Sequence, residues 1–245
     1  MNKILVMFSM ALFSTNPIEK NNSDYEPLII NEAISASMTH VEQQVRNAAV
    51  RVITPQGGHG SGSLIIYKGT QFVITAEHVA DDEMGTAYQL IHQNESIVGI
   101  LIYADEAHDI ALLAIPRKFA TATPMKYNPI KKVLDVGSEI TYSGFPSRHS
   151  LMTFRGRVAG YEHKGSKGTQ IIVHTYGWFG CSGSVIYDEK GNLVGVLWGV
   201  DVVYRPGYQV QEDMIWISPI ANLNIERAIG YWCEAIEHES PACRI

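Results

Sequence analysis

Three segments of the chain carry residues that together could catalyse acyl transfer. His78 follows one apolar run, Asp109 comes directly before another, and Ser182 lies in a Gly-x-Ser-Gly turn that leads into a third. A serine hydroxyl is a weak nucleophile at neutral pH and needs a base beside it. An imidazole can take the serine proton and return it to a leaving amine, while a carboxylate fixes its tautomer and stabilises the imidazolium. The three residues therefore predict a catalytic triad.

The combination of the three residues is more specific than any one of them. A histidine at a strand end, an aspartate before a strand and a Gly-x-Ser-Gly turn are each common for structural reasons alone. Here the order is His, Asp, Ser, with separations of 31 and 73 residues. This order argues against an α/β-hydrolase, in which the nucleophile precedes the acid and the histidine. The glycines around Ser182 also let the N–H groups of Gly180 and Ser182 form an oxyanion hole.

The elements that must position these residues are predicted to be short strands. Runs of four to eight residues rich in Val, Ile and Tyr, broken by Gly, Pro or Asn, fill most of the chain from residue 47 onward. Such runs are typical of a barrel or sandwich. They do not alternate with long helices, which argues against a parallel α/β sheet. Hairpin turns are expected at 68–70 and 190–192. A helix is expected from about Ser218-Pro219 to Ala235.

The composition fits a globular chain without a nucleic-acid partner. Of 245 residues, 46% are hydrophobic and 18% charged, so a sizeable core can be buried. The net charge is −6, and no basic run is longer than Lys131-Lys132, whereas phosphate binding needs clustered cations. We also expect no stable membrane span, because no apolar run reaches about 18 residues.

The ends of the chain carry further signals. Residues 1–15 resemble a short secretory signal without a small-x-small cleavage site, which favours export to a periplasmic or extracellular location over the cytoplasm. Residues 16–46 are interpreted as an N-terminal arm with a short helix within 37–45. Cys233 and Cys243 could close a C-terminal loop in an oxidising compartment or stay free thiols. The chain has three cysteines, the third being Cys181, and an odd number leaves at least one thiol unpaired.

The motifs around the triad resemble the trypsin/chymotrypsin superfamily, most closely the high-temperature-requirement (Deg-type) bacterial proteases. The matching segments are Gly60-Ser61-Gly62-Ser63, Thr75-Ala76-Glu77-His78-Val79, Asp109-Ile110-Ala111-Leu112-Leu113, Gly180-Cys181-Ser182-Gly183-Ser184 and Asn192-Leu193-Val194-Gly195-Val196. The resemblance implies an all-β fold of two antiparallel six-stranded β-barrels with a short C-terminal helix. The protease domain would span 47–230, with the barrels joined at about 118–135 and a tail at 231–245.

The resemblance also implies a serine endopeptidase that needs no metal or cofactor and acts on a protein or peptide substrate. No PDZ domain is expected after residue 245, and an oligomer or an activating partner is left open. Cys181 stands where the family has Asn or Asp, so activation by an ion pair between that Asp and a new N-terminus is not expected. Ser184 replaces a second glycine, and Glu77 adds negative charge beside the predicted base.

The primary specificity pocket is predicted from positions relative to Ser182. We expect the pocket to be formed by Tyr176 at the base, by Gly177 and Phe179 at the wall, and by Leu197, Trp198 and Gly199 on the strand that pairs with substrate. No acidic residue stands at the base, so small or medium apolar side chains are favoured over Lys or Arg. His174 could instead belong to a pocket for acidic side chains, although a strand histidine is the simpler interpretation.

Two alternatives to this assignment stay open. Cys181 could be the nucleophile, as in viral chymotrypsin-like cysteine proteases, but those have Gly-x-Cys-Gly, and here the register differs by one residue. The chain could also be an inactive pseudoprotease that uses the barrels for binding or assembly. The unusual residue at position 181 and the lack of an evident specificity pocket motivate this second hypothesis.

Overall fold

The computed structural model describes residues 34, 36–205, 207–235 and 240–243, and the fold below is that of the unit from Met38 onward. The signal-like segment 1–15 and most of the predicted arm lie outside the described residues. None of the helices in the described ranges is long and apolar enough to cross a membrane.

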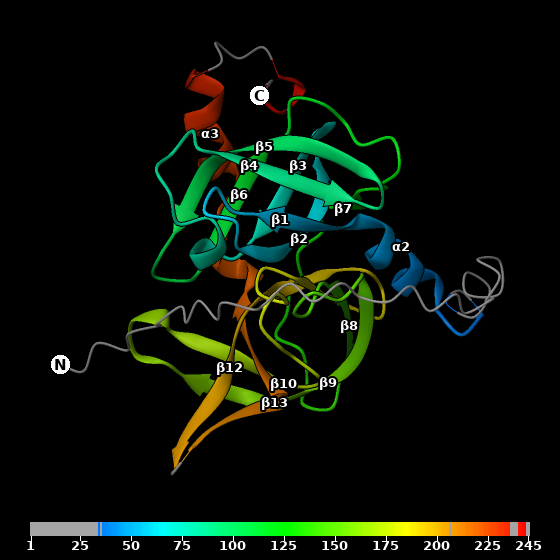
Figure 1. The fold of residues 1–245 in the computed structure, drawn as a ribbon, viewed down its shortest axis with the longest axis vertical. Coiled ribbons are helices and arrows are strands. Elements are labelled where there is room, and N and C mark those ends of the chain that lie inside the picture. Colours follow the sequence, from blue (N-terminus) through cyan, green and yellow to red (C-terminus); the bar gives the residue numbers. More distant parts are fainter. Residues whose placement is uncertain (1–33, 35, 206, 236–239, 244–245) are drawn as a thin grey trace, which may run out of the picture. The chain divides into compact units, whose positions relative to one another are not determined.

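Six strands close the first barrel, and a seventh extends its sheet (Figure 1). These strands are β1 (Ala49–Ile53), β2 (His59–Tyr67), β3 (Thr70–Thr75), β4 (Ala87–His92), β5 (Glu95–Asp105), β6 (Ile110–Ala114) and β7 (Met125–Lys126). Pairing of β1 with β2 closes the order β1-β4-β5-β6-β3-β2, in which neighbours are antiparallel, and β7 adds parallel to β2. All five residues of β6 are buried, which explains why its sequence is apolar throughout rather than alternating.

The second barrel also closes from six antiparallel strands, in the order β10-β13-β12-β11-β8-β9. Its strands are β8 (Glu139–Gly144), β9 (Met152–His163), β10 (Thr169–His174), β11 (Val185–Asp188), β12 (Leu193–Arg205) and β13 (Gly207–Pro219). Each barrel encloses its own apolar core cluster. The two closed barrels confirm the predicted fold class. Beyond the barrel, residues 201–205 pair with 207–211 in a long hairpin that projects at the bottom of Figure 1.

The hairpin turns lie where the sequence predicts them, whereas the C-terminal helix begins later. Lys68 and Gly69 both have positive φ, as a tight two-residue turn between β2 and β3 requires. Helix α3 (Ile225–Ala235) starts seven residues after the predicted Ser218. The reason is that Ser218 and Pro219 complete the ladder between β13 and β12, and barrel closure overrides the local helix signal.

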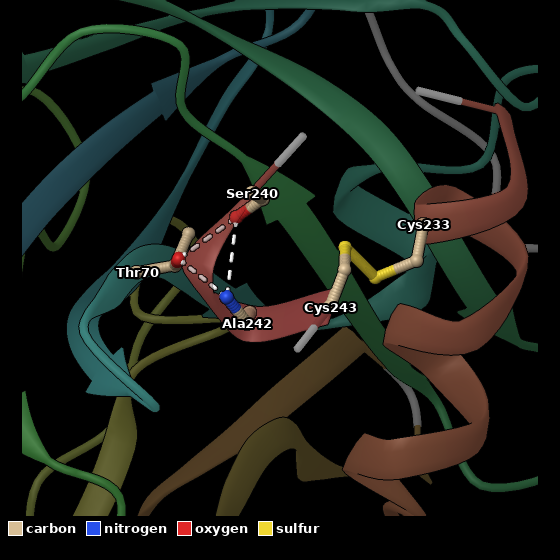
Figure 2. The surroundings of a disulfide bond; sticks show 5 residues. All are labelled: Thr70, Cys233, Ser240, Ala242 and Cys243. Atoms are coloured by element: carbon tan, nitrogen blue, oxygen red, sulfur yellow. Dashed lines mark hydrogen bonds between the residues drawn. A yellow bond between two sulfur atoms is a disulfide. The ribbon is translucent and has the colours of Figure 1, made fainter. Parts of the chain in front are cut away.

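A disulfide fastens the described part of the C-terminal tail to α3 (Figure 2). It joins Cys233 of α3 to Cys243, with Cα atoms 5.4 Å apart. The hydroxyl of Thr70, at the start of β3, lies 2.9 Å from that of Ser240 and accepts the N–H of Ala242 at 3.1 Å. The tail is therefore joined to α3 by one covalent bond and held to the first barrel by two hydrogen bonds. Of the two states left open by the sequence, the structure has the disulfide.

Helix α2 (His40–Ala48) connects the two barrels through a buried carboxylate. The helix leads directly into β1, and its N-cap residue Thr39 forms a reciprocal capping box with Glu42. The Glu42 side chain, 4% exposed, also accepts the Arg155 Nη2–H of β9 at 2.6 Å. The Arg155 hydrogen bond, opposed by burial and helped by Thr39, lowers the pKa of Glu42 from 4.5 to about 2. The charged carboxylate therefore stabilises the folded state.

Replacing Glu42 with glutamine is expected to lower the free energy of unfolding by about 2 kcal/mol at neutral pH. Because the folded pKa lies below the unfolded one, this stabilisation is complete above pH 4.5 and is lost as pH falls toward 2. Urea unfolding of both proteins at pH 7 and pH 3 measures the difference. A matched control is Glu139→Gln, since the Glu139–Arg157 pair is more than half exposed and should change stability by less than about 0.5 kcal/mol. An equal loss at both pH values would contradict the assignment.

Candidate active site

The structure brings His78 and Asp109 together at one end of the first barrel. His78 lies in the short 3-10 helix η1 (Glu77–Val79) just after β3, and Asp109 lies in the turn before β6. Antiparallel pairing of β3 with β6 makes these two ends neighbours. His78 Nδ1 is 2.9 Å from Asp109 Oδ1, and the His78 backbone N–H donates to the same oxygen at 3.1 Å. The carboxylate is therefore placed to fix the orientation of the imidazole.

The backbone at Asp109 is held in an uncommon conformation. Its φ of +58° is in the left-handed region, which aspartate tolerates better than most residues. In an extended strand, the neighbouring His108 would point away from Asp109 and be exposed to solvent. His108 lies in a turn and is half-buried. It forms its own pair with Asp105, with Nδ1 2.8 Å from Oδ2. Two His–Asp pairs thus lie side by side at this turn.

The electrostatics of the site favour an ionised Asp109. Burial acts to raise the pKa of its carboxyl, but hydrogen bonds from His78 and electrostatic attraction to His78 and Lys167 outweigh burial, so the pKa is lowered. Burial and the negative charges of Asp109, Asp81 and Glu106 raise the pKa of Glu77. Glu77, the residue next to His78, is therefore a carboxyl group that ionises less readily than usual.

The segment of Ser182 packs against the segment of His78 across the two barrels. The Ser182 carbonyl accepts the Ser61 N–H of β2 at 2.8 Å. A Cβ added to Gly183 would lie 2.9 Å from the N atom of Ala76, two residues before His78. The structure thus brings all three predicted triad segments together. Within the described ranges the hydrogen bonds of His78 go to Asp109, and none joins its ring to Ser182. A bond between the base and the nucleophile is often long in the absence of substrate.

The carbonyl groups of the loop before Ser182 are hydrogen-bonded within the protein. The Phe179 carbonyl accepts the Ser147 N–H at 2.6 Å, and the Gly180 carbonyl accepts the Ser61 hydroxyl at 2.7 Å. Gly180 has a φ of +94°, which only glycine adopts readily. No acceptor for the N–H groups of Gly180 or Ser182 is found among the described residues. Both donors are therefore free to bind an anion.

The thiol of Cys181 faces the interior rather than the site. Its side chain is fully buried in the core cluster of the second barrel. Burial raises its pKa, against the opposing effect of the Trp178 backbone and the Tyr142 hydroxyl. A nucleophilic cysteine instead needs exposure and a lowered pKa. The geometry favours Ser182 over Cys181 as the reactive group.

The residues predicted to bind substrate lie in different surroundings. Phe179 is 61% exposed beside the loop, Trp198 is half-buried, and a Cβ on Gly199 would meet only open space. Leu197, by contrast, is buried, and a Cβ on Gly177 would lie 2.2 Å from Ile215 Cγ2. Phe179, Trp198 and Gly199 are therefore at least partly accessible to a ligand, whereas Leu197 and Gly177 pack behind them.

Tyr176 and His174 lie beside a cavity away from the triad segments. The Tyr176 ring stacks on Phe154 with centroids 5.4 Å apart, and its carbonyl accepts the Tyr142 hydroxyl. Both Tyr176 and His174 line a cavity of about 700 Å³ between α2 and the second barrel. That cavity is lined by neither Ser182 nor His78, so its position is distinct from the triad segments.

Ser61 supports the loop before Ser182, a role that the Gly-Ser-Gly-Ser motif does not reveal. Its buried hydroxyl donates to the Gly180 carbonyl and accepts the Phe145 N–H at 3.0 Å. Ser61→Ala removes both bonds, and we expect kcat/KM for a peptide substrate to fall about tenfold because the loop is less well ordered. Ser63→Ala is the matched control, because the Ser63 hydroxyl bonds Tyr187 instead. Equal losses in the two variants would show that the effect is general destabilisation.

The closed barrels, with these segments at their junction, define the trypsin-like double-barrel class. Residues 60–196, more than half of the chain, match the Trypsin-like peptidase domain, and the chain belongs to this family. No curated protein sequence matches the chain.

Solved structures show the same fold at low sequence identity. The inactive form of the Rv3671c protease is 15% identical with a TM-score of 0.60, over 81% of this chain and 96% of that one. The active form of the Rv3671c protease from M. tuberculosis is 16% identical with a TM-score of 0.58, over 80% and 85%. Both forms are similar to this chain to nearly the same extent.

Proposed function

We propose that this peptidase is a serine endopeptidase with Ser182 as nucleophile, His78 as general base and Asp109 as the residue that orients the base. The observation that carries the proposal is the double engagement of Asp109 Oδ1 by the N–H and the ring of His78. The loop before Ser182 supports it, because its Gly180 carbonyl is held by the Ser61 hydroxyl. The Deg-type proteases remain the group that its motifs resemble most. The disulfide supports the proposed export, because such bonds persist in oxidising compartments.

The proposed reaction proceeds in two halves. Ser182 Oγ attacks the carbonyl carbon of the scissile bond while His78 Nε2 takes the hydroxyl proton. The N–H groups of Gly180 and Ser182 stabilise the negative oxygen of the tetrahedral intermediate. The amine leaves with the proton from His78, and an acyl group stays on Ser182. A water, deprotonated by His78, then releases the second product and restores the serine.

The side chain recognised before the scissile bond is proposed to be small or medium and apolar. Gly177 packs tightly against Ile215 and Val200. The wall behind Phe179, Trp198 and Gly199 is therefore apolar. None of the residues predicted for the base and wall of the pocket, Tyr176, Gly177 and Phe179, is acidic, so they offer no ion pair to a cationic side chain. Peptide-library profiling should therefore favour apolar residues over Lys and Arg at the cleaved position.

The alternative function is that of an inactive binding or assembly module. Two observations favour it. No hydrogen bond joins Ser182 to His78, and Tyr176 is stacked on Phe154 beside the cavity between α2 and the second barrel. Against it, every predicted triad residue is present and their segments meet.

Turnover of an unfolded protein distinguishes the two functions. Reduced, carboxymethylated lactalbumin is incubated with wild type, Ser182→Ala and the remote control Ser138→Ala, and products are identified by mass spectrometry. An endopeptidase yields peptides with wild type and Ser138→Ala, while Ser182→Ala is slower by about 10⁶-fold. If all three folded proteins bind the substrate equally and none cleaves it, the binding-module function is correct.

A further inference from the structure

A lysine of the second barrel reaches the aspartate of the proposed triad on the first. Lys167 ends the short 3-10 helix η2 (Gly165–Lys167), which joins β9 to β10. Its Nζ lies 3.4 Å from Asp109 Oδ2 and 3.5 Å from the Glu106 carbonyl. The other carboxylate oxygen, Oδ1, is the one bound by His78. Each oxygen of Asp109 therefore has its own cationic or N–H partner.

The position of Lys167 is fixed by a chain of contacts within the second barrel. The Lys167 carbonyl accepts the Nε2–H of Gln170, whose side chain is fully buried. The Oε1 atom of Gln170 in turn accepts the indole N–H of Trp198 at 2.8 Å. The Lys167 ammonium lies 5.0 Å from the centre of the Trp198 ring, and only 28% of its side chain is exposed. Such contacts hold the ammonium in place before substrate binds.

We propose that Lys167 is a positioning residue of this peptidase, which locks the Asp109 carboxylate from the side opposite His78 and restrains protonation of the base. The proposal rests on the serine-peptidase function proposed above. Fixing the second oxygen prevents rotation of the carboxylate about its own axis. The orientation of the imidazole, which Asp109 Oδ1 sets, is then fixed as well.

The charge of Lys167 opposes the other charges around the base. Lys167 on η2 acts on Asp109, and Glu77 on η1 interacts with a cluster of carboxyl groups from Asp109, Asp81 and Glu106. Carboxylates around an imidazole favour its charged form, whereas a nearby ammonium disfavours it. Removing the ammonium should therefore keep His78 protonated to higher pH, where it cannot act as a base.

The test is the pH dependence of the rate at which a fluorophosphonate labels the protein. Wild type is compared with Lys167→Met, Lys167→Arg and the matched control Lys164→Met between pH 5 and 9. Lys164 is on the same loop, but its ammonium lies 3.7 Å from the centre of the Trp216 ring instead. In Lys167→Met the acid limb of the profile should move up by about 0.5 to 1 pH unit, and the plateau should fall about tenfold. Lys167→Arg should restore the wild-type limb, and Lys164→Met should not move it.

The outcomes separate this inference from the proposed function. Labelling of wild type with a limb that is unmoved in Lys167→Met would overturn the role of Lys167 and leave the peptidase intact. A lower plateau with an unmoved limb would likewise assign Lys167 a purely structural role. No labelling of folded wild type at any pH would overturn the proposed function and, with it, the inference.

Discussion

Asp109→Asn is expected to lower kcat/KM for a peptide substrate by about 10⁴-fold with little change in stability. A single oxygen of Asp109 accepts both the backbone N–H and the ring of His78. An asparagine amide can turn its NH₂ group toward the imidazole and stabilise the tautomer whose Nε2 carries a proton. In that tautomer the ring cannot accept the proton of Ser182. The measurement is steady-state hydrolysis, with thermal unfolding followed in parallel.

The neighbouring Asp105 provides the matched control for this prediction. Its pair with His108 has nearly the same geometry, 2.8 Å against 2.9 Å, and lies at the same turn. Asp105→Asn disrupts a His–carboxylate pair without touching the proposed base, so kcat/KM should stay within about threefold of wild type. Comparable losses in the two variants would mean that the turn as a whole, and not Asp109 in particular, supports activity.

Gly180→Ala is expected to lower kcat/KM by about 10² to 10³-fold, because it displaces the oxyanion donors. The added Cβ would lie 2.4 Å from the Phe145 carbonyl and 2.7 Å from the Nε2 atom of His59, at a φ of +94°. The loop can relieve this clash only by rotating its peptides. Rotation would break the hydrogen bonds that hold the Phe179 and Gly180 carbonyls in place. KM should change much less than kcat, since the donors act mainly on the transition state.

Gly137→Ala separates this effect from simple backbone strain. Gly137 has a similar φ of +91°, but a Cβ there would meet nothing within 4 Å. It should cost about 1 kcal/mol of stability and leave kcat/KM unchanged. If Gly180→Ala also retained full activity, the N–H of Gly180 would not be a donor to the transition state.

The fold could be predicted from the sequence because its signals are local. Runs such as 110–113 and 193–197 are short, apolar and bounded by turn residues, and they become strand β6 and the buried first part of β12. The late start of α3 could not be predicted, since Ser218 and Pro219 look like a helix start until β12 is available as a pairing partner. Tertiary pairing decided this boundary, as it often does.

The proposed triad could be predicted from its motifs, but its supporting residues could not. His78, Asp109 and Ser182 each adjoin a recognisable strand. Ser61 and Lys167 act through partners 119 and 58 residues away, and nothing in their local sequence indicates those contacts. Lys167 in particular lies in a short polar turn that predicts only a loop.

The substrate-binding predictions rest on offsets from Ser182 and therefore depend on side-chain direction. Offsets locate the backbone of residues such as Tyr176 and Phe179 but not their rings. The structure turns Phe179 to the surface and stacks Tyr176 on Phe154, a contact with a strand more than 20 residues earlier. Long-range packing of this kind has no signature in a single sequence. The roles of these residues in substrate binding stay predictions.

The most direct test of Ser182 as nucleophile is the site of covalent fluorophosphonate attachment. Purified wild type, Ser182→Ala and Cys181→Ala are treated with the reagent, and the adduct is located by intact-mass and peptide mass spectrometry. We predict one adduct per chain on Ser182 in wild type and in Cys181→Ala, and none in Ser182→Ala. An adduct on Cys181, or an unlabelled wild type whose fold is intact, would contradict the assignment of a serine peptidase.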